Sequence, residues 1–221
     1  MLTIIDDDGN AKFYSDVLPI ITSEHVSISS ACPVGTIGTE GAMTWEQVEE
    51  CYRNGAEILS HAYNHVTSYP SEMTEKEVEQ DFTKAKNGLL SRGFYGGRYH
   101  VFTVSTGEDS RAKAAAPYVF DLAINSAGNA MNYADTINIY RISRYRIQTD
   151  SYQYDLDALK ALIDTCYNSK GWMVWMFHTS DITWTTTAKE NLIAAIQYAK
   201  GKGLPIVSVD YVWNHYLRKM V

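Results

Sequence analysis

Met-Leu-Thr-Ile-Ile-Asp-Asp-Asp-Gly-Asn, residues 1–10, begins with a short apolar run and continues into three consecutive acids. An apolar run of this length, Leu2–Ile5, predicts a strand that is buried on both faces. The same pattern recurs further along the chain, where apolar runs end just before His61 and just before His178. Polar clusters in these positions are typical of α/β barrels, whose functional side chains lie at the carboxyl ends of the strands.

Helical segments alternate with the apolar runs over the whole chain. Two of them begin with a capping box, in which Thr44 precedes Gln47 and Thr74 precedes Glu77. This alternation predicts βαβ units and a mostly parallel sheet. The expected strands cover residues 2–5, 25–29, 55–60, 99–104, 120–125, 172–177 and 205–209, and residues 136–147 alternate between apolar and polar. The expected helices cover residues 12–21, 43–54, 155–166, 186–200 and 211–217, with one more beginning at Thr74.

Length and composition limit the class of protein. With 221 residues, 45% of them hydrophobic, the chain can bury the core of a single α/β domain over residues 1–221, and disorder is excluded. The 26 acidic residues outnumber the 19 basic ones, which argues against a protein that binds nucleic acid through its phosphates. No apolar run is long enough for a membrane span, and no signal-peptide pattern is present. The three cysteines form no Cys-x-x-Cys pair, so neither a thiolate zinc site nor a disulfide framework is indicated.

Asp6, Asp7 and Asp8 are the first candidates for chemistry. Adjacent carboxylates repel one another unless a cation or an arginine compensates them. Because neighbouring residues of an extended chain point in opposite directions, one acid can bind a metal while the next acts as a base. A solvated acidic turn is an equally good interpretation of the tripeptide alone.

Histidines supply the other candidates. His61 and His65 are four residues apart, so on a helical turn they would share a face and could bind one divalent metal. Taken alone, they could also be incidental, and His178 could be a core histidine. If the sheet closes, however, these residues and the acids converge, and one carboxylate with two histidines is a known ligand set for a divalent metal. The remaining histidines, at positions 25, 100 and 215, are expected to be structural.

These motifs resemble the polysaccharide deacetylases of carbohydrate esterase family 4, the NodB homology domain. Residues 5–9, Ile-Asp-Asp-Asp-Gly, resemble the family's Thr-Phe-Asp-Asp-Gly. Residues 55–65, Gly-Ala-Glu-Ile-Leu-Ser-His-Ala-Tyr-Asn-His, are similar to its Gly-His-Glu-Ile-Gly-Asn-His-Thr-x-x-His, which is the more specific match. Residues 171–178 resemble the late strand that ends in the family histidine, and residues 201–209 resemble the closing segment. The resemblance therefore covers essentially the whole chain.

The chain departs from the family pattern in its third motif. The family's Arg-Pro-Pro-Tyr-Gly falls at residues 103–107, Thr-Val-Ser-Thr-Gly, which lack the arginine, and no Asp-x-x-x-Asp-Trp motif is evident. Some relatives supply an arginine from a later Arg-x-x-Val segment, which residues 144–147 resemble. We therefore expect Arg144 to orient the catalytic aspartate, with Arg146 or Arg141 as substitutes. Cross-strand pairing is an equally open interpretation of any one of these arginines.

The resemblance implies a distorted (β/α) barrel of about seven parallel strands that binds one divalent metal ion, most often zinc. It implies a hydrolase that removes N-acetyl, and possibly O-acetyl, groups from a polysaccharide or oligosaccharide, and an extracellular or cell-surface location. A backbone N–H near residues 105–107 would help to hold the oxyanion. The implied metal ligands are Asp8, His61 and His65; the implied catalytic residues are Asp7 as base, His178 as acid and Arg144; the implied substrate contacts are Tyr63, Trp175 and Ser105, with Trp184 as a further aromatic.

Three other interpretations stay open. The chain is a non-catalytic carbohydrate-binding relative if the altered third motif has removed turnover. A different metal hydrolase would be an amidohydrolase of small molecules or a phosphoesterase. The phosphoesterase would need a second metal or a basic phosphate clamp, and only the cluster Arg141–Arg146 offers such a clamp. A phosphoacceptor signalling domain built on the acids would have no use for the histidines, and we rank it last.

Overall fold

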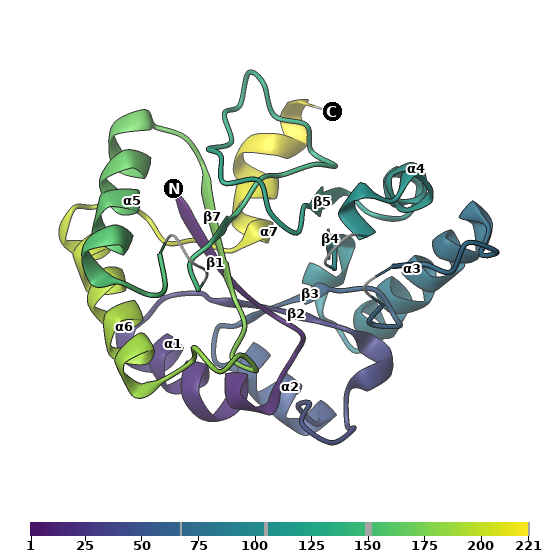
Figure 1. Ribbon diagram of the computed structural model, residues 1–221, viewed down its shortest axis with the longest axis horizontal. Coiled ribbons are helices and arrows are strands. Elements are labelled where there is room, and N and C mark those ends of the chain that lie inside the picture. The colour runs from purple at the N-terminus through teal and green to yellow at the C-terminus, as the bar shows by residue number, and fades with distance from the viewer. Residues whose placement is uncertain (67, 104–105, 149–151, 221) are drawn as a thin grey trace.

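The computed structural model describes residues 1–66, 68–103, 106–148 and 152–220. The described residues form one curled sheet of parallel strands in the order β5-β4-β3-β2-β1-β7-β6, with helices packed around it (Figure 1). The distorted (β/α) barrel of about seven parallel strands is thereby confirmed. The strands are β1 (Leu2–Asp7), β2 (Ser29–Cys32), β3 (Glu57–Ser60), β4 (Tyr99–Val101), β5 (Leu122–Ile124), β6 (Tyr145–Arg146) and β7 (Met173–Phe177).

The sheet curls because its outer strand β5 is paired with the segment that leads into β6, the strand at the other edge. The backbone N–H of Ala123 donates to the carbonyl of Ile139, and that of Asn125 donates to the carbonyl of Ile142. Ile124 and Ile142 form an isolated parallel bridge. The stretch 136–147, expected as an alternating strand, therefore contributes a mostly irregular connection that brings the two edges together.

Helices cover the outer face of the sheet. In Figure 1, α1, α5 and α6 lie together on one side of the molecule and α3 and α4 on the other. Both predicted capping boxes are present, at Thr44 and Thr74. No helix in the described part of the chain has the length and apolar character needed to cross a membrane. The α-helices are α1 (Leu18–Glu24, after a π-helical turn at Phe13–Val17), α2 (Trp45–Arg53), α3 (Glu75–Leu90), α4 (Ser110–Val119), α5 (Leu156–Ser169), α6 (Thr186–Gly201) and α7 (Val209–Val212).

Three local predictions are wrong. The strand expected at residues 25–29 begins only at Ser29, because α1 ends at His25 in a left-handed conformation and the chain needs the next residues to turn back. Helix α4 was not predicted, since its alanine-rich sequence has a weak apolar stripe and contains Pro117. Residues 205–209 form only one bridge, between Leu2 and Ile206, before Ser208 caps α7.

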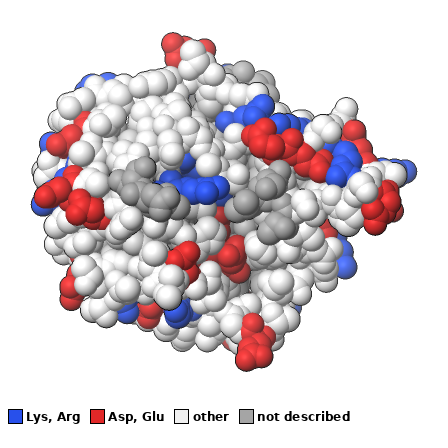
Figure 2. Space-filling view, viewed as in Figure 1, with Lys and Arg blue, Asp and Glu red and all other residues white. Residues whose placement is uncertain are grey.

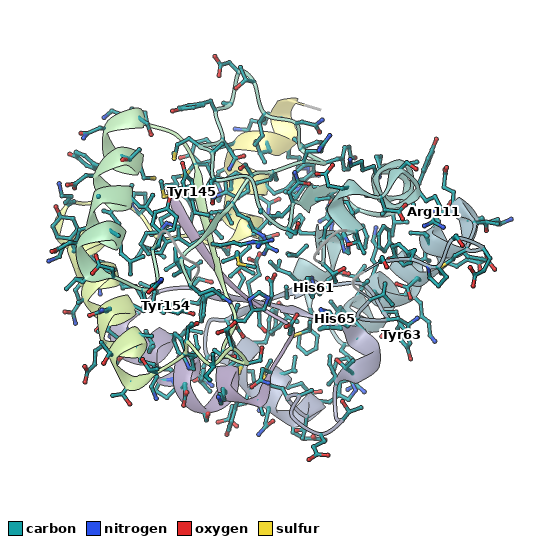
Figure 3. The ribbon with its side chains drawn as sticks, in the orientation of Figure 1. His61, Tyr63, His65, Arg111, Tyr145 and Tyr154 are labelled. Carbon is teal, nitrogen blue, oxygen red and sulfur yellow. The ribbon has the colours of Figure 1, made fainter. Side chains whose placement is uncertain are left out.

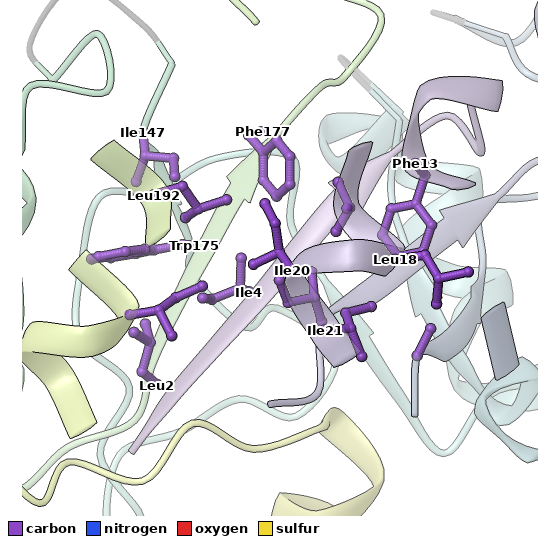
Figure 4. Close-up of a cluster of buried hydrophobic side chains, with 14 of the residues drawn as sticks. Leu2, Ile4, Phe13, Leu18, Ile20, Ile21, Ile147, Trp175, Phe177 and Leu192 are labelled. Carbon is purple, nitrogen blue, oxygen red and sulfur yellow. The ribbon is translucent and has the colours of Figure 1, made fainter. Parts of the chain in front are cut away.

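The residues of β1 alternate between two cores. Leu2 and Ile4 belong to the larger core outside the sheet, where Trp175 and Phe177 of β7 meet Leu192 of α6 and side chains of α1 (Figure 4). Thr3, Ile5 and Asp7 have the opposite parity and Ile5 belongs to the core inside the curl, which α7 helps to close. This alternation places Asp7 on the inner face, at the carboxyl end of its strand.

Trp175 is fully buried in the outer core, and its indole N–H contacts the sulfur of Met173. The predicted sugar contact for Trp175 is therefore wrong, because a side chain with no exposed surface cannot stack on a polymer. Trp184 is also buried and stacks on Phe177, so it belongs to the same core.

Glu57, the first residue of β3, is a buried acid at the amino-terminal end of the sheet. Its carboxyl accepts hydrogen bonds from the Ser29 hydroxyl at 2.7 Å and from the backbone N–H groups of Val209 and Asp210 at 2.8 and 2.7 Å. Burial outweighs these hydrogen bonds and raises the pKa of Glu57 to about 7. Glu57 therefore links the start of the sheet to the start of α7.

Because the pKa of Glu57 is higher in the folded protein than its ordinary value of 4.5, the unfolded chain releases this proton first as pH rises. The free energy of unfolding is expected to fall between about pH 4.5 and pH 7 by at most about 3 kcal/mol, and to lose no more above that range. Glu57→Gln should remove this slope. Urea unfolding of both proteins across the range measures the difference, with the exposed Glu40→Gln as control. Identical slopes for wild type and Glu57→Gln would contradict the prediction.

Candidate active site

The predicted chemical residues converge at the carboxyl ends of the strands. Asp7 ends β1, while Asp8, His61 and His178 each follow a strand, β1, β3 and β7 respectively. Figure 3 shows His61 and His65 beside each other near the middle of the molecule, and their ring centroids are 5.4 Å apart. Strands far apart in sequence thus supply one cluster, as the closing of the sheet predicts.

Asp7 and Arg144 form a buried ion pair. Nη1 and Nη2 of Arg144 donate to the two carboxylate oxygens of Asp7 at 2.8 and 2.7 Å. Burial alone would raise the pKa of Asp7, but the charge of Arg144 outweighs it and lowers the pKa. Asp7 is therefore ionised at neutral pH and held in one orientation, as a proton acceptor in catalysis must be.

Asp8 lies between two histidines. Its Oδ1 is 3.5 Å from Nε2 of His61 and 3.0 Å from Nε2 of His65. The backbone of Asp8 has a φ of +78°, and Gly9 follows with +61°. A Cβ on Gly9 would lie 3.1 Å from the Cys32 sulfur, so this turn both strains Asp8 and requires the glycine. The strained turn directs the Asp8 carboxylate toward the histidines.

The donor set of Asp8, His61 and His65 fits a divalent cation. Nδ1 of His61 lies 2.7 Å from the carbonyl of Val101, which can only accept, so neutral His61 presents the lone pair of Nε2 to Asp8. Oδ1 of Asp8 is buried and has no hydrogen-bond donor among the described residues. One ligand atom from each of the three residues lies within 4.8 Å of the others. Electron-pair donors gathered this way require a proton or a metal cation between them.

The segment 61–65 is not helical, so the predicted helical turn for the two histidines is wrong. Ala62 has a φ of +66°, a left-handed conformation, so the chain turns there and does not continue as a helix. Backbone N–H groups of Val34 and Gly35 donate to the carbonyls of Ala62 and Tyr63 at 3.2 and 2.9 Å. The two histidines converge on Asp8 because neighbouring segments hold this loop in place. The four-residue spacing of the histidines is not the cause.

Asp81 of α3 anchors the same loop. Its carboxylate accepts from the backbone N–H groups of Tyr63 and Asn64 at 3.1 and 3.2 Å, and from the Asn64 side chain at 2.7 Å. Asp81 is not among the residues predicted from the sequence. A signal was present, since an acid lies on the apolar stripe of a helix, between Val78 and Ala85.

Arg111 of α4 holds the following residues. Its guanidinium donates to the carbonyls of Tyr69, Pro70 and Met73, and it also pairs with Asp109 (Arg111 is labelled in Figure 3). The Thr103 hydroxyl donates to the carbonyl of Val66. The loop that carries His65 is thus fixed at both ends by side chains, none of which is among the residues predicted from the sequence.

His178 lies on the opposite side of the acids from the histidine pair. Its Nε2 is 3.9 Å from Oδ2 of Asp7 and 3.8 Å from Oδ2 of Asp8, and its Nδ1 is 3.0 Å from Oε1 of Gln148. Asp6 accepts from the backbone N–H and the hydroxyl of Thr179 at 2.7 and 3.1 Å, and burial raises its pKa. Asp6 therefore fixes the residue after His178, a role that the sequence did not indicate.

The remaining predicted residues lie in different surroundings, and not all of them are near the acids. Arg141 pairs with exposed Glu108 on the surface and does not reach Asp7 in this structure. The ring of Tyr63 lies 3.5 Å beneath the Lys84 ammonium, and its contact with sugar stays a prediction. Ser105 lies outside the described residues. His100 is buried among the rings of Phe82, Phe102 and Phe120, which fits a structural residue.

A hollow of about 250 Å³ lies beside Asp8 and His65. Its other lining residues come from the turn after β1 and the loop after β2, namely Asn10, Pro33, Thr36, Thr39, Glu40, Gly41 and Ala42. In the face shown in Figure 2, acidic and basic atoms meet near the centre without forming one continuous patch of either sign.

Solved structures with the same fold include a family 4 carbohydrate esterase from Streptomyces lividans in complex with acetate, with a TM-score of 0.64 and 11% identity, covering 94% of this chain and 92% of that one. Another is the Xyl-CE4 domain of a multidomain xylanase from the hindgut metagenome of Trinervitermes trinervoides, with a TM-score of 0.61 and 16% identity, covering 100% and 91%. A third is a mutant of BA3943, a CE4 family pseudoenzyme with restored enzymatic activity, with a TM-score of 0.63 and 12% identity, covering 96% and 66%.

No curated protein matches the sequence closely enough to define a relative. A family model described as Polysaccharide deacetylase does match, over residues 1–118, which include Asp7, Asp8, His61 and His65. This match covers more than half of the chain, and the curled parallel sheet agrees with it. The chain therefore belongs to the polysaccharide deacetylase family.

Proposed function

We propose that this protein is a metal-dependent hydrolase that removes acetyl groups, N-linked or O-linked, from an acetylated polysaccharide or oligosaccharide. The observation that carries the proposal is the convergence of Asp8, His61 and His65 beside the Asp7–Arg144 ion pair. The family match supports the substrate class. The hollow beside Asp8 and His65 gives a sugar residue access to this cluster.

Asp8, His61 and His65 would hold one divalent metal ion, with zinc as the first choice for a carboxylate and two imidazoles. When bound, such an ion lowers the pKa of a coordinated water and polarises the acetyl carbonyl. The carbonyl of Val101 keeps the ring of His61 turned with Nε2 toward Asp8.

Asp7 would take the proton of the attacking water, because it is ionised and its two oxygens are fixed by Arg144. His178 would give a proton from Nε2 to the departing sugar amine or hydroxyl, since this nitrogen faces both acids. The C–N or C–O bond to the acetyl carbon breaks and acetate leaves. The backbone near residues 106–107 would supply a donor to the oxyanion.

The alternative is a carbohydrate-binding relative without turnover. One similar structure comes from a protein described as a pseudoenzyme, and this chain lacks the usual arginine at residues 103–107. The position of Arg144 on Asp7 favours the enzyme, because a retained buried ion pair orients the proposed base. Acetate release from acetylated oligosaccharides decides between them.

His61→Ala removes a ligand atom. We therefore expect it to lower the affinity for zinc by more than the 10–100-fold loss that is typical when a residue that only hydrogen-bonds to a ligand is changed. Competition with a chromophoric chelator measures the affinity, and elemental analysis measures the bound metal. His215→Ala, which alters an exposed histidine on the last turn, is the control. Unchanged affinity in His61→Ala would exclude this ligand set.

Asp7→Asn is expected to reduce kcat for acetate release by about 10²–10⁴-fold, because the amide cannot take a proton. Zinc affinity should stay close to that of the wild type, since Asp7 is not among the three proposed ligands. Thermal unfolding checks that the buried arginine still folds into place. Full turnover by a folded Asp7→Asn protein would contradict the role of base.

Asp81→Asn should lower zinc affinity by about 10–100-fold, because Asn presents an N–H₂ group to at least one backbone donor and loosens the loop that carries His65. Glu75→Gln, which also replaces a carboxylate with an amide but at an exposed site on α3, is the matched control. The visible spectrum of the cobalt-substituted protein should shift only for Asp81→Asn. A spectrum and an affinity equal to the control would show that Asp81 does not position the ligand.

A further inference from the structure

Gln148 lies between His178 and a second acid, Asp181. Its Oε1 is 3.0 Å from Nδ1 of His178, and its Nε2 donates to Oδ2 of Asp181 at 3.2 Å. Gln148 as a whole residue is 8% exposed, so water has little access to it. An amide can bind in either of two orientations, and the neighbouring groups decide which one it adopts.

Asp181 decides the orientation of this amide. Its Oδ1 accepts from the backbone N–H and the hydroxyl of Thr183, both at 2.8 Å, and these bonds lower the pKa of Asp181. An ionised carboxylate has no proton to donate, so its Oδ2 requires a donor. The N–H₂ group of Gln148 must therefore face Asp181, which leaves the carbonyl oxygen of Gln148 facing His178.

The same logic fixes the proton on His178. The carbonyl oxygen of Gln148 can only accept, so Nδ1 of His178 carries hydrogen in the neutral ring. In the neutral ring Nε2 is then the nitrogen with the free electron pair, so it is the nitrogen that must first gain the proton that His178 donates. It lies 3.9 and 3.8 Å from the carboxylates of Asp7 and Asp8.

We propose that Gln148 and Asp181 are positioning residues that set the tautomer of His178, Asp181 acting through the Gln148 amide. The catalytic consequence rests on the proposed function, in which His178 donates from Nε2. We call the two hydrogen bonds that join Asp181, Gln148 and His178 the relay. The relay lets Nδ1 of His178 keep its hydrogen and its acceptor whether Nε2 of His178 is protonated or free. The tautomer itself depends only on the protein's own hydrogen bonds.

Asp181→Asn tests the relay with a change of one atom. The backbone N–H of Thr183 still requires an acceptor, so the Asn oxygen takes the place of Oδ1 and its N–H₂ group faces Gln148. The Gln148 amide must then rotate by half a turn and present N–H₂ to His178. We expect the Nε2–H tautomer of neutral His178 in this variant, where the wild type has Nδ1–H. Nitrogen–proton correlation NMR on the full chain with labelled histidine measures the tautomer, and His178→Gln assigns the signals.

The double variant Asp181→Asn with Gln148→Glu provides the rescue. The carboxylate introduced at position 148 accepts from the Asn N–H₂ group on one side and from Nδ1–H of His178 on the other, which restores the original tautomer. The kcat for acetate release is expected to fall by about 10²-fold in Asp181→Asn, with little change in KM, and to recover in large part in the double variant. A merely structural role for Asp181 predicts no recovery.

The outcomes are distinguishable. An Nδ1–H tautomer in folded Asp181→Asn, or an Nε2–H tautomer in the double variant, would overturn the relay. An inverted tautomer with wild-type acetate release would confirm the relay and overturn its catalytic consequence, and with it the proposed role of His178 as the acid. Asp157→Asn, an acid in the first turn of α5, is the matched control and should change neither readout.

Discussion

The buried pair of Asp7 and Arg144 joins residues 137 positions apart in the sequence, and both side chains are almost wholly removed from water. Two charges in such a place are costly to desolvate, and only good geometry compensates for that cost. Both carboxylate oxygens are matched to the guanidinium, so the segment before β6 is held against the end of β1. Removing either partner would leave the other charged and unpaired inside the molecule, a loss of about 3–5 kcal/mol. The pair therefore fixes both the mouth of the barrel and the direction of the proposed base.

Around this pair, side chains that bind backbone groups fix each loop that carries chemistry. Asp81 and Arg111 hold the residues on either side of His65, and Asp6 holds Thr179 next to His178. Asp6 and Asp81 are buried, and a buried carboxyl without hydrogen-bond donors is costly, so both are committed to their partners. The loops of the candidate active site consequently depend on the outer helices α3 and α4 as well as on the strands. A change on the outside of the barrel can thus alter the spacing of the proposed ligands without touching them.

Much of the fold follows from local sequence. Leu2–Ile5 and Trp172–Phe177 are continuous apolar runs, and such runs are strands buried on both faces. The capping boxes at Thr44 and Thr74 likewise mark true helix starts. What the sequence did not reveal depends on contacts between distant segments. The loop 61–65 takes its shape from Val34, Gly35 and Asp81, so the spacing of its histidines suggested a helix that is not there. Gln148 and Asp181 are polar residues without periodicity, and only their geometry shows that Gln148 faces His178 and that Asp181 faces Gln148.

The segment 139–142, which bridges β5 and the approach to β6, also affects how molecules of this protein meet one another. A strand at the edge of an open sheet presents unpaired N–H and carbonyl groups, which are a template for strand addition by another chain and for aggregation. Here the N–H groups of Ala123 and Asn125 are already taken up by Ile139 and Ile142. The irregular connection thus occupies these groups at the edge of β5 with the chain's own backbone, so they are not free to pair with a strand of another molecule.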